Sequence, residues 1–222
     1  AELHALMPRA DALKKQRGQG GRTVSVVAGK TLGMIFEKPS TRTRVAFEVA
    51  MFELGGYAVY LAPTGTQIGR GEPLSDTARV LASYCHGIVI RTFAQTRAME
   101  LASYASVPVL NGLTDEYHPC QVVADLLTVY QRKGEVVGPR YAWIGDGNNM
   151  AHSWINATAI LGLDLRLACP PGHAPAPEVV ERARRHIAQT GRGRVELGTD
   201  PRSAVRDADV VSTDVWASMG QE

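Results

Sequence analysis

The chain has 222 residues, of which 45% are hydrophobic and 21% are charged, and its formal net charge is +2. This composition is typical of a globular protein with enough apolar side chains for one large domain or two ordinary ones. So small a net charge argues against nucleic acid or a membrane surface as the partner, and any important positive charge must be local.

The cysteines indicate a reducing compartment. Cys85, Cys120 and Cys169 are widely spaced and odd in number, and no CxxC pair occurs. This pattern suits free thiols better than a disulfide framework or a zinc site. No apolar run approaches the roughly 20 residues of a membrane span, and no signal-peptide pattern opens the sequence. We therefore expect a cytoplasmic protein without a metal site.

The first part of the chain alternates short apolar runs with helical patterns. In chain order we predict strand 31–36, helix 40–54, strand 57–62, helix 73–85, strand 87–92, helix 95–105, strand 107–112 and helix 120–134. Within helix 40–54, Val45, Val49 and Phe52 recur at i, i+4 and i+7, which predicts a core-facing stripe. Ser75 is a candidate N-cap for helix 73–85.

The alternation restarts after Gly138-Pro139, the best candidate for a domain boundary. The predicted elements are strand 141–145, helix 149–161, strand 163–170, a polar helix 177–190, a short strand at "RVELG" and strand 209–215. Such alternation predicts an α/β fold of two doubly wound parallel-sheet domains, 1–137 and 138–222. Ligands in such sheets bind beyond the carboxyl ends of the strands, so we expect the active site in the cleft between the domains.

The stretch "STRTR", from Ser40 to Arg44, crowds hydroxyls and arginines at a predicted helix start. The N–H groups of a helix N-terminus favour a phosphate. The hydroxyls of Ser40, Thr41 and Thr43 add donors, and Arg42 can bind a phosphate through two hydrogen bonds. A capped helix with surface ion pairs is the alternative. The density of the cluster favours an anion site.

Other candidates are weaker when taken singly. Arg91 ends an apolar strand and would point toward the ligand region, although an exposed strand-end arginine is equally compatible with the pattern. His118 and Gln121, in "EYHPCQ", could hydrogen-bond a carbonyl or amide.

The stretch "GDGNN" after strand 141–145 invites a dinucleotide-binding interpretation, but Met150 occupies the position of the third glycine. Asn148 and Asn149 begin a helix there, where one could bind a carboxylate. Near the other end, Asp214 lies at the end of predicted strand 209–215 and could hold an ammonium group or cap a helix.

Together these stretches resemble the aspartate/ornithine carbamoyltransferase family, and specifically its ornithine carbamoyltransferase branch. The matching motifs are "FEKPSTRTR", "TQIGRGEPLSDTARVL", "IVIRT", "HPCQVVADLLT", "GDGNNMAHS" and "TDVWASMG". "STRTR" and "HPxQ" are shared with the aspartate branch, whereas "GDGNN" and "DVWxSMG" are similar to the ornithine branch.

The resemblance implies a role for each matching residue. The residues implied to bind carbamoyl phosphate are Ser40, Thr41, Arg42, Thr43, Gln67, Arg91, His118 and Gln121. Among these, Arg91, His118 and Thr43 would be catalytic, and Gln67 would be donated by a neighbouring subunit of a homotrimer. The residues implied to bind ornithine are Asn149, Asp214, Ser218 and Met219.

The implied reaction is carbamoyl transfer from carbamoyl phosphate to the δ-amine of L-ornithine, giving L-citrulline and phosphate, without metal or cofactor. The family continues with an "HCLP" segment and a final helix, so we expect the C-terminal part of the second domain to be absent from this chain. Two alternatives stay open: a carbamoyltransferase for putrescine or an N-acylornithine, and an inactive paralogue that binds carbamoyl phosphate. The same site would serve arginine synthesis or degradation.

Overall fold

A computed structural model describes residues 2–20, 25–62 and 64–215 of the chain. The chain forms two compact units. One consists of Ala12–Cys120, and the other combines Ala1–Asp11 with Gln121–Glu222. Each is described by itself below, and the prediction of domains at 1–137 and 138–222 stays a prediction.

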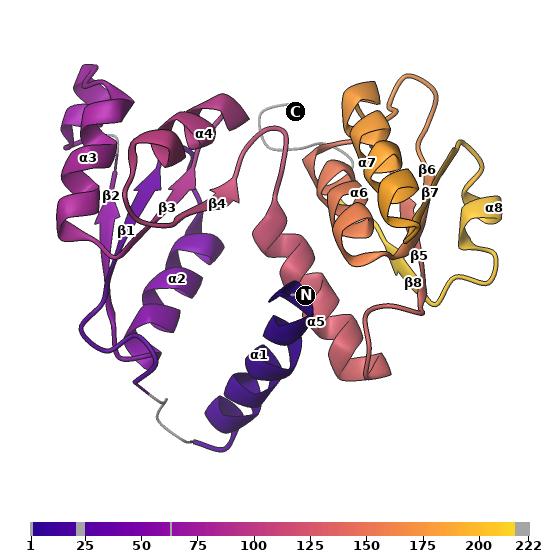
Figure 1. The fold of residues 1–222 in the computed structure, drawn as a ribbon, viewed down its shortest axis with the longest axis horizontal. Helices are drawn as coiled ribbons and strands as arrows, with labels where there is room; N and C mark the ends of the chain where they lie inside the picture. Colours follow the sequence, from indigo (N-terminus) through magenta and orange to yellow (C-terminus); the bar gives the residue numbers. More distant parts are fainter. Residues whose placement is uncertain (1, 21–24, 63, 216–222) are drawn as a thin grey trace. The chain divides into compact units, whose positions relative to one another are not determined.

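The unit Ala12–Cys120 contains a four-stranded sheet in which every neighbouring pair is parallel (Figure 1). Its strands, in the spatial order β2-β1-β3-β4, are β1 Thr31–Phe36, β2 Tyr57–Leu61, β3 Gly87–Arg91 and β4 Val109–Leu113. All five residues of β3 are buried, as expected of a central parallel strand covered on both faces. Strand β4 begins two residues later than predicted, directly after Pro108, which has no N–H to donate to the sheet.

Helices cover both faces of this sheet. They are α2 Thr41–Glu53, the 3-10 turn η1 Gln67–Arg70, α3 Leu74–Tyr84 and α4 Gln95–Tyr104. Helices α3 and α4 pack on one face, where Leu74 and Leu101 join Ile88 and Ile90 in the core. Helix α2 covers the other face, where Phe47 and Met51 pack against strand residues such as Met34.

The other unit contains a second parallel sheet of four strands, in the order β7-β6-β5-β8. Its strands are β5 Arg140–Ile144, β6 Asp164–Ala168, β7 Arg194–Gly198 and β8 Val210–Ser212. The helices are α5 Pro119–Lys133, α6 Asn149–Leu161, α7 Pro177–Thr190 and α8 Pro201–Val205, together with the first residues of α1 Glu2–Gly18. The two parallel sheets confirm the predicted α/β class.

Two local predictions were wrong. Val45, Val49 and Phe52 are exposed by 49%, 37% and 77%, so their stripe does not face the core. The face of α2 that meets the sheet is the one with Phe47 and Met51, one turn apart, and the sheet covers only that side. Ser75 does not cap α3, because the helix already begins at Leu74 after Pro73.

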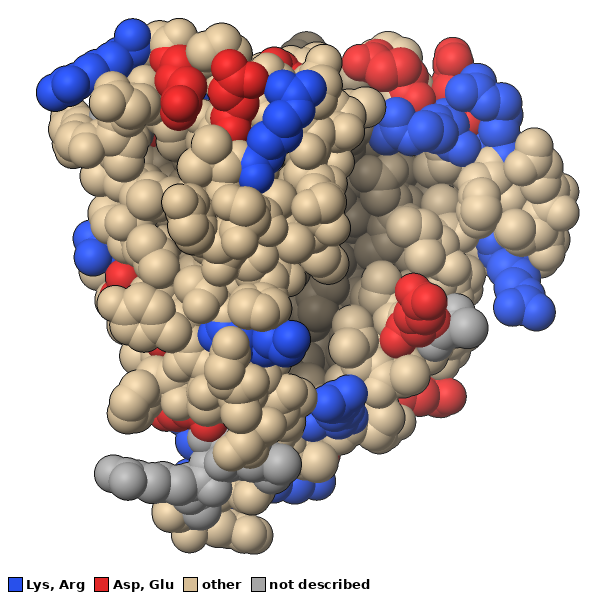
Figure 2. Space-filling model, turned by 60° about the vertical axis from the view of Figure 1, so that its left-hand side comes forward, with Lys and Arg blue, Asp and Glu red and all other residues tan. Residues whose placement is uncertain are grey.

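On the face drawn in Figure 2, Lys and Arg lie interspersed with Asp, Glu and uncharged residues, in keeping with the net charge of +2. Within the described residues, no helix is long and apolar enough to cross a membrane.

Candidate functional site

The first candidate site lies where the strand order of the first sheet reverses. Strand β1 pairs with β2 on one side and with β3 on the other, and Phe36 is opposite Arg91 at the carboxyl ends of β1 and β3. The connection after β1 runs to the start of α2. Ligands of doubly wound sheets bind at such a reversal point. The topology therefore brings Arg91 and the "STRTR" segment to the same end of the sheet.

Ser40 is the N-cap of α2, one residue before the helix, although the predicted helix began at Ser40 itself. Its backbone is extended, and its Oγ accepts a hydrogen bond of 3.3 Å from the Thr43 N–H. Because a hydroxyl can accept and donate at once, the Ser40 proton stays available for a ligand oxygen. The remaining first-turn N–H groups have no partner within the helix. The start of α2 thus offers several donors to an anion, with the exposed Thr41 and Arg42 beside them.

Arg91 is a buried cation at the end of β3. Its side chain is only 6% exposed, and burial lowers the pKa of its guanidinium. None of the described residues accepts a hydrogen bond from Arg91 Nε. Burial of a charge is unfavourable, and a bound anion would compensate it. The exposed strand-end alternative for Arg91 is therefore excluded.

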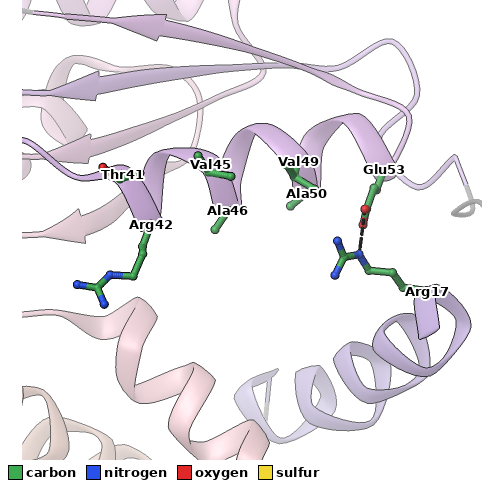
Figure 3. A pocket seen from close by; sticks show the side chains of 8 residues that line it. All are labelled: Arg17, Thr41, Arg42, Val45, Ala46, Val49, Ala50 and Glu53. Atoms are coloured by element: carbon green, nitrogen blue, oxygen red, sulfur yellow. Dashed lines mark hydrogen bonds and ion pairs between the residues drawn. The ribbon is translucent and has the colours of Figure 1, made fainter.

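The two arginines of "STRTR" have different surroundings. The Arg44 guanidinium lies 3.6 Å from the centre of the Tyr60 ring, and its Nε is 2.9 Å from Glu48 Oε1. Arg42 instead projects from the first turn of α2 into an open hollow of about 590 Å³ (Figure 3). The exposed Val45 and Val49 line the same hollow, and the Arg17–Glu53 ion pair lies at its other end. Of the two arginines, Arg42 is the one placed to bind a ligand.

His118 and Gln67 lie on other connections of this unit. His118 is half-buried directly before α5, and Gln67 is the exposed first residue of η1, after β2. Gln121 lies in the first turn of α5, where its amide donates a 2.8 Å hydrogen bond to Asp125 Oδ1. Burial, with the charge of Asp214 as a smaller cause, raises the pKa of Asp125.

The second candidate site lies at the corresponding reversal point of the other sheet. Strand β5 pairs with β6 and β8, and Trp143 is opposite Ser212 near the carboxyl ends of β5 and β8. Asn148 follows β5 and caps α6, with its Oδ1 accepting from the N–H groups of Met150 and Ala151. Its amide also donates a 3.2 Å hydrogen bond to Asp214 Oδ2. The structure thus joins two candidates that are 66 residues apart in sequence.

Asn149, which was singled out with Asn148, is the first residue of α6 and accepts a hydrogen bond at its carbonyl from Ser153. Ser218 and Met219 lie outside the described residues. The contact between Asn148 and Asp214 was missed by sequence reasoning. Its signal was the position of Asn148, because an Asn just before a helix is a preferred cap whose amide remains free to donate.

Gly147 of "GDGNN" is not used as a dinucleotide fingerprint would use it. Its N–H donates a 2.8 Å hydrogen bond to the carbonyl of His173, and a Cβ here would lie 2.2 Å from the Pro175 nitrogen. The space that the missing Gly147 side chain leaves is therefore occupied by backbone atoms of the same chain. In the part of the chain that the structure describes, no three His, Cys, Asp or Glu side chains gather so as to hold a metal ion.

Comparison with known families matches both parts of the chain to one family. Residues 1–131 match the carbamoyl-P binding domain of aspartate/ornithine carbamoyltransferase, and residues 138–222 match the Asp/Orn binding domain. The ornithine carbamoyltransferase of Pelobacter propionicus is 54% identical over 221 residues, which are 100% of this chain and 71% of that protein.

Solved structures give the same result. The ornithine carbamoyltransferase of Pyrococcus furiosus is similar with a TM-score of 0.91 and 48% identity, over 100% of this chain and 70% of that one. The anabolic ornithine carbamoyltransferase of Campylobacter jejuni is similar with a TM-score of 0.89 and 41% identity, over 99% of this chain and 71% of that one.

Proposed function

The chain belongs to the aspartate/ornithine carbamoyltransferase family, and we infer that it transfers the carbamoyl group of carbamoyl phosphate to the δ-amine of L-ornithine, giving L-citrulline and phosphate. The observation that carries the proposal within the structure is Arg91, a buried guanidinium whose Nε has no acceptor among the described residues, at the strand reversal that also leads to α2. The similarity of the whole chain to ornithine carbamoyltransferases supports ornithine as the acceptor.

Carbamoyl phosphate is bound by residues of the unit Ala12–Cys120 and by the start of α5. Ser40, Thr41, Arg42 and Thr43 hold the phosphate through hydroxyls, first-turn N–H groups and a guanidinium. Arg91 bridges the phosphate and the carbonyl oxygen, and His118 and Gln121 contact the carbamoyl group. The capped helix start and the buried Arg91 support these assignments.

The reaction follows from charge. The uncharged δ-amine attacks the carbamoyl carbon, a C–N bond forms, and negative charge develops on the carbonyl oxygen. Arg91, Thr43 and His118 stabilise this oxyanion, and one such preorganised donor contributes about 3 kcal/mol in other enzymes. The tetrahedral intermediate collapses as the bond from carbon to the phosphate oxygen breaks, and the departing phosphate takes the amine proton.

Ornithine is bound by the second candidate site. The Asp214 carboxylate pairs with the α-ammonium group, and Asn149, Ser218 and Met219 complete the α-amino-acid site. The hydrogen bond from Asn148 to Asp214 Oδ2 supports this assignment, since it holds the carboxylate at the carboxyl end of β8. An acceptor without an α-amino group, such as putrescine, would leave Asp214 without its partner.

We further propose a homotrimer in which Gln67 completes the carbamoyl phosphate site of a neighbouring subunit. The exposed position of Gln67 on η1 supports a role toward another copy. The widely spaced cysteines support a cytoplasmic enzyme, and the reaction places it in arginine metabolism.

Parallel assays of citrulline formation test the acceptor. The protein is given carbamoyl phosphate with ornithine, putrescine, N-acetylornithine or aspartate, and the carbamoylated product is measured. Product from ornithine alone is expected. Faster turnover of putrescine or N-acetylornithine would identify that amine as the acceptor in place of ornithine. If no acceptor is carbamoylated although the protein binds phosphate, the inactive paralogue would be favoured.

A further inference from the structure

Glu37 is a nearly buried carboxylate with three donors at the carboxyl end of the first sheet. Its side chain is 11% exposed. Arg97 Nε donates to Oε2 over 3.0 Å, and Arg97 Nη2 donates to Oε1, so the ion pair is bidentate. The hydroxyl of Thr92, which is fully buried, also donates to Oε2. A carboxylate with this many charge-assisted hydrogen bonds is held firmly in one position.

The partners of Glu37 belong to the connection between β3 and α4. Thr92 follows Arg91 directly, and Arg97 lies in the first turn of α4. The backbone repeats the link, because the Glu37 N–H donates a 2.8 Å hydrogen bond to the carbonyl of Arg91. Glu37 therefore ties the segment that leads to Ser40 to the end of the strand that carries Arg91.

Lys38 ties the same segment to a third connection, between β4 and α5. Its ammonium pairs with Asp115 and lies 4.7 Å from the centre of the Phe93 ring. The Asp115 N–H donates a 2.7 Å hydrogen bond to the carbonyl of Phe93, so this connection is also joined to the one after β3. The segment that leads to Ser40, the segment that follows Arg91 and the segment that leads to His118 are thus linked through Glu37 and Lys38.

We propose that Glu37 is a positioning residue, whose carboxylate holds the segment between β1 and α2 against the end of β3 and so fixes the anion-binding start of α2 relative to Arg91. This inference rests on the proposed function, because it assumes that both groups bind the phosphate of carbamoyl phosphate. Glu37 and Arg97 neutralise each other, so removing the carboxylate leaves an uncompensated Arg97 charge that by itself would favour an anion. Weaker phosphate binding in such a variant would therefore report the loss of positioning and not a change of charge.

Inorganic phosphate is the probe for the first test, since its binding does not depend on turnover. Titration calorimetry on the whole chain compares wild type with Glu37→Gln, which keeps the side-chain size but loses the charge that holds Arg97. We expect the Kd for phosphate to rise about tenfold, as for the loss of one charge-assisted interaction. The control is Asp76→Asn, which breaks the exposed pair of Asp76 with Arg79 on α3 and should leave the Kd unchanged.

Kinetics distinguish positioning from general destabilisation. In Glu37→Gln, the KM for carbamoyl phosphate should rise while the KM for ornithine stays at its wild-type value. The milder Thr92→Val deletes one donor to Glu37 and should raise the phosphate Kd by about threefold. This variant takes the place of Glu37→Gln in the phosphate titration if Glu37→Gln does not fold.

A phosphate Kd within about twofold of wild type in the folded Glu37→Gln, or in Thr92→Val if that variant alone folds, would overturn the inference. An equal rise of both KM values would overturn it too. Citrulline formation by the wild type tests the proposed function separately, so the two failures can be told apart.

Discussion

At the scale of single residues, identical side chains take different roles because their surroundings differ. Arg42 and Arg44 are two positions apart on α2, so they point in different directions. Arg44 stacks on Tyr60 and pairs with Glu48, whereas Arg42 projects into the hollow beside the helix start. The tertiary structure therefore separates a structural arginine from a ligand-binding candidate within one motif.

This separation predicts different consequences for two alanine variants. Arg42→Ala should raise the KM for carbamoyl phosphate roughly tenfold to a hundredfold, because a charge-assisted hydrogen bond to the phosphate contributes about 1.5–3 kcal/mol. Arg44→Ala should lower the melting temperature and leave that KM nearly unchanged. Steady-state kinetics and thermal unfolding measure both. A larger rise of KM in Arg44→Ala than in Arg42→Ala would contradict the assignment.

At the scale of elements, the turn between β5 and α6 depends on one glycine. The loop before α7 lies against Gly147, where an added Cβ would be 2.2 Å from the Pro175 nitrogen and 2.4 Å from the Ala174 carbonyl carbon. These are backbone atoms, which cannot rotate away as the end of a side chain can. Gly147 therefore brings two loops together next to Asn148 and Asp214.

Gly147→Ala should destabilise this unit by about 1–3 kcal/mol, the usual cost of overpacking. Urea unfolding measures the change. Gly198→Ala is the matched control in the same unit, because the nearest atom to its added Cβ is 3.9 Å away. Since the displaced turn holds Asn148, the KM for ornithine should rise as well. Wild-type stability of Gly147→Ala would show that the loops can separate without cost.

At the scale of the whole molecule, each unit contains a carboxyl group whose pKa is lowered in the folded chain. Burial alone would raise the pKa of Glu37, but the hydrogen bonds from Arg97 and Thr92 hold it below its ordinary value. In the other unit, the Arg140 N–H is the main cause that lowers the pKa of Asp209. Both groups therefore stabilise the folded chain while they are charged.

The free energy of unfolding should consequently fall as the pH drops through these lowered pKa values, below the ordinary carboxyl range near about 4. The sign follows from linkage, because the unfolded chain binds these protons at higher pH than the folded one. Asp125, whose pKa burial raises, acts in the opposite sense and reduces the loss. Urea unfolding between about pH 7 and about pH 3 measures the effect. A constant free energy over that range would contradict it, and Glu37→Gln should show a smaller drop.

Sequence periodicity predicted most elements because a buried parallel strand and a helix differ in length and pattern. Strand β1, helix α2 to within one residue at each end, and helix α6 agree with the predicted segments. The core face of α2 was not predictable, since apolar residues lie on two sides of that helix and only contact with the sheet distinguishes them. Likewise, the contact of Asn148 with Asp214 depends on the pairing of β5 with β8.

By itself, the sequence determined the fold class and the family, and it predicted an anion site at "STRTR", because these depend on residue types and their local order. Only the tertiary structure decided that Arg91 is buried with its Nε unpaired among the described residues, that Arg44 is held by Tyr60 and Glu48, and that Glu37 links the segment before Ser40 to β3. The physical reason is that burial and hydrogen bonding depend on strand neighbours far apart in the chain, which local patterns do not specify.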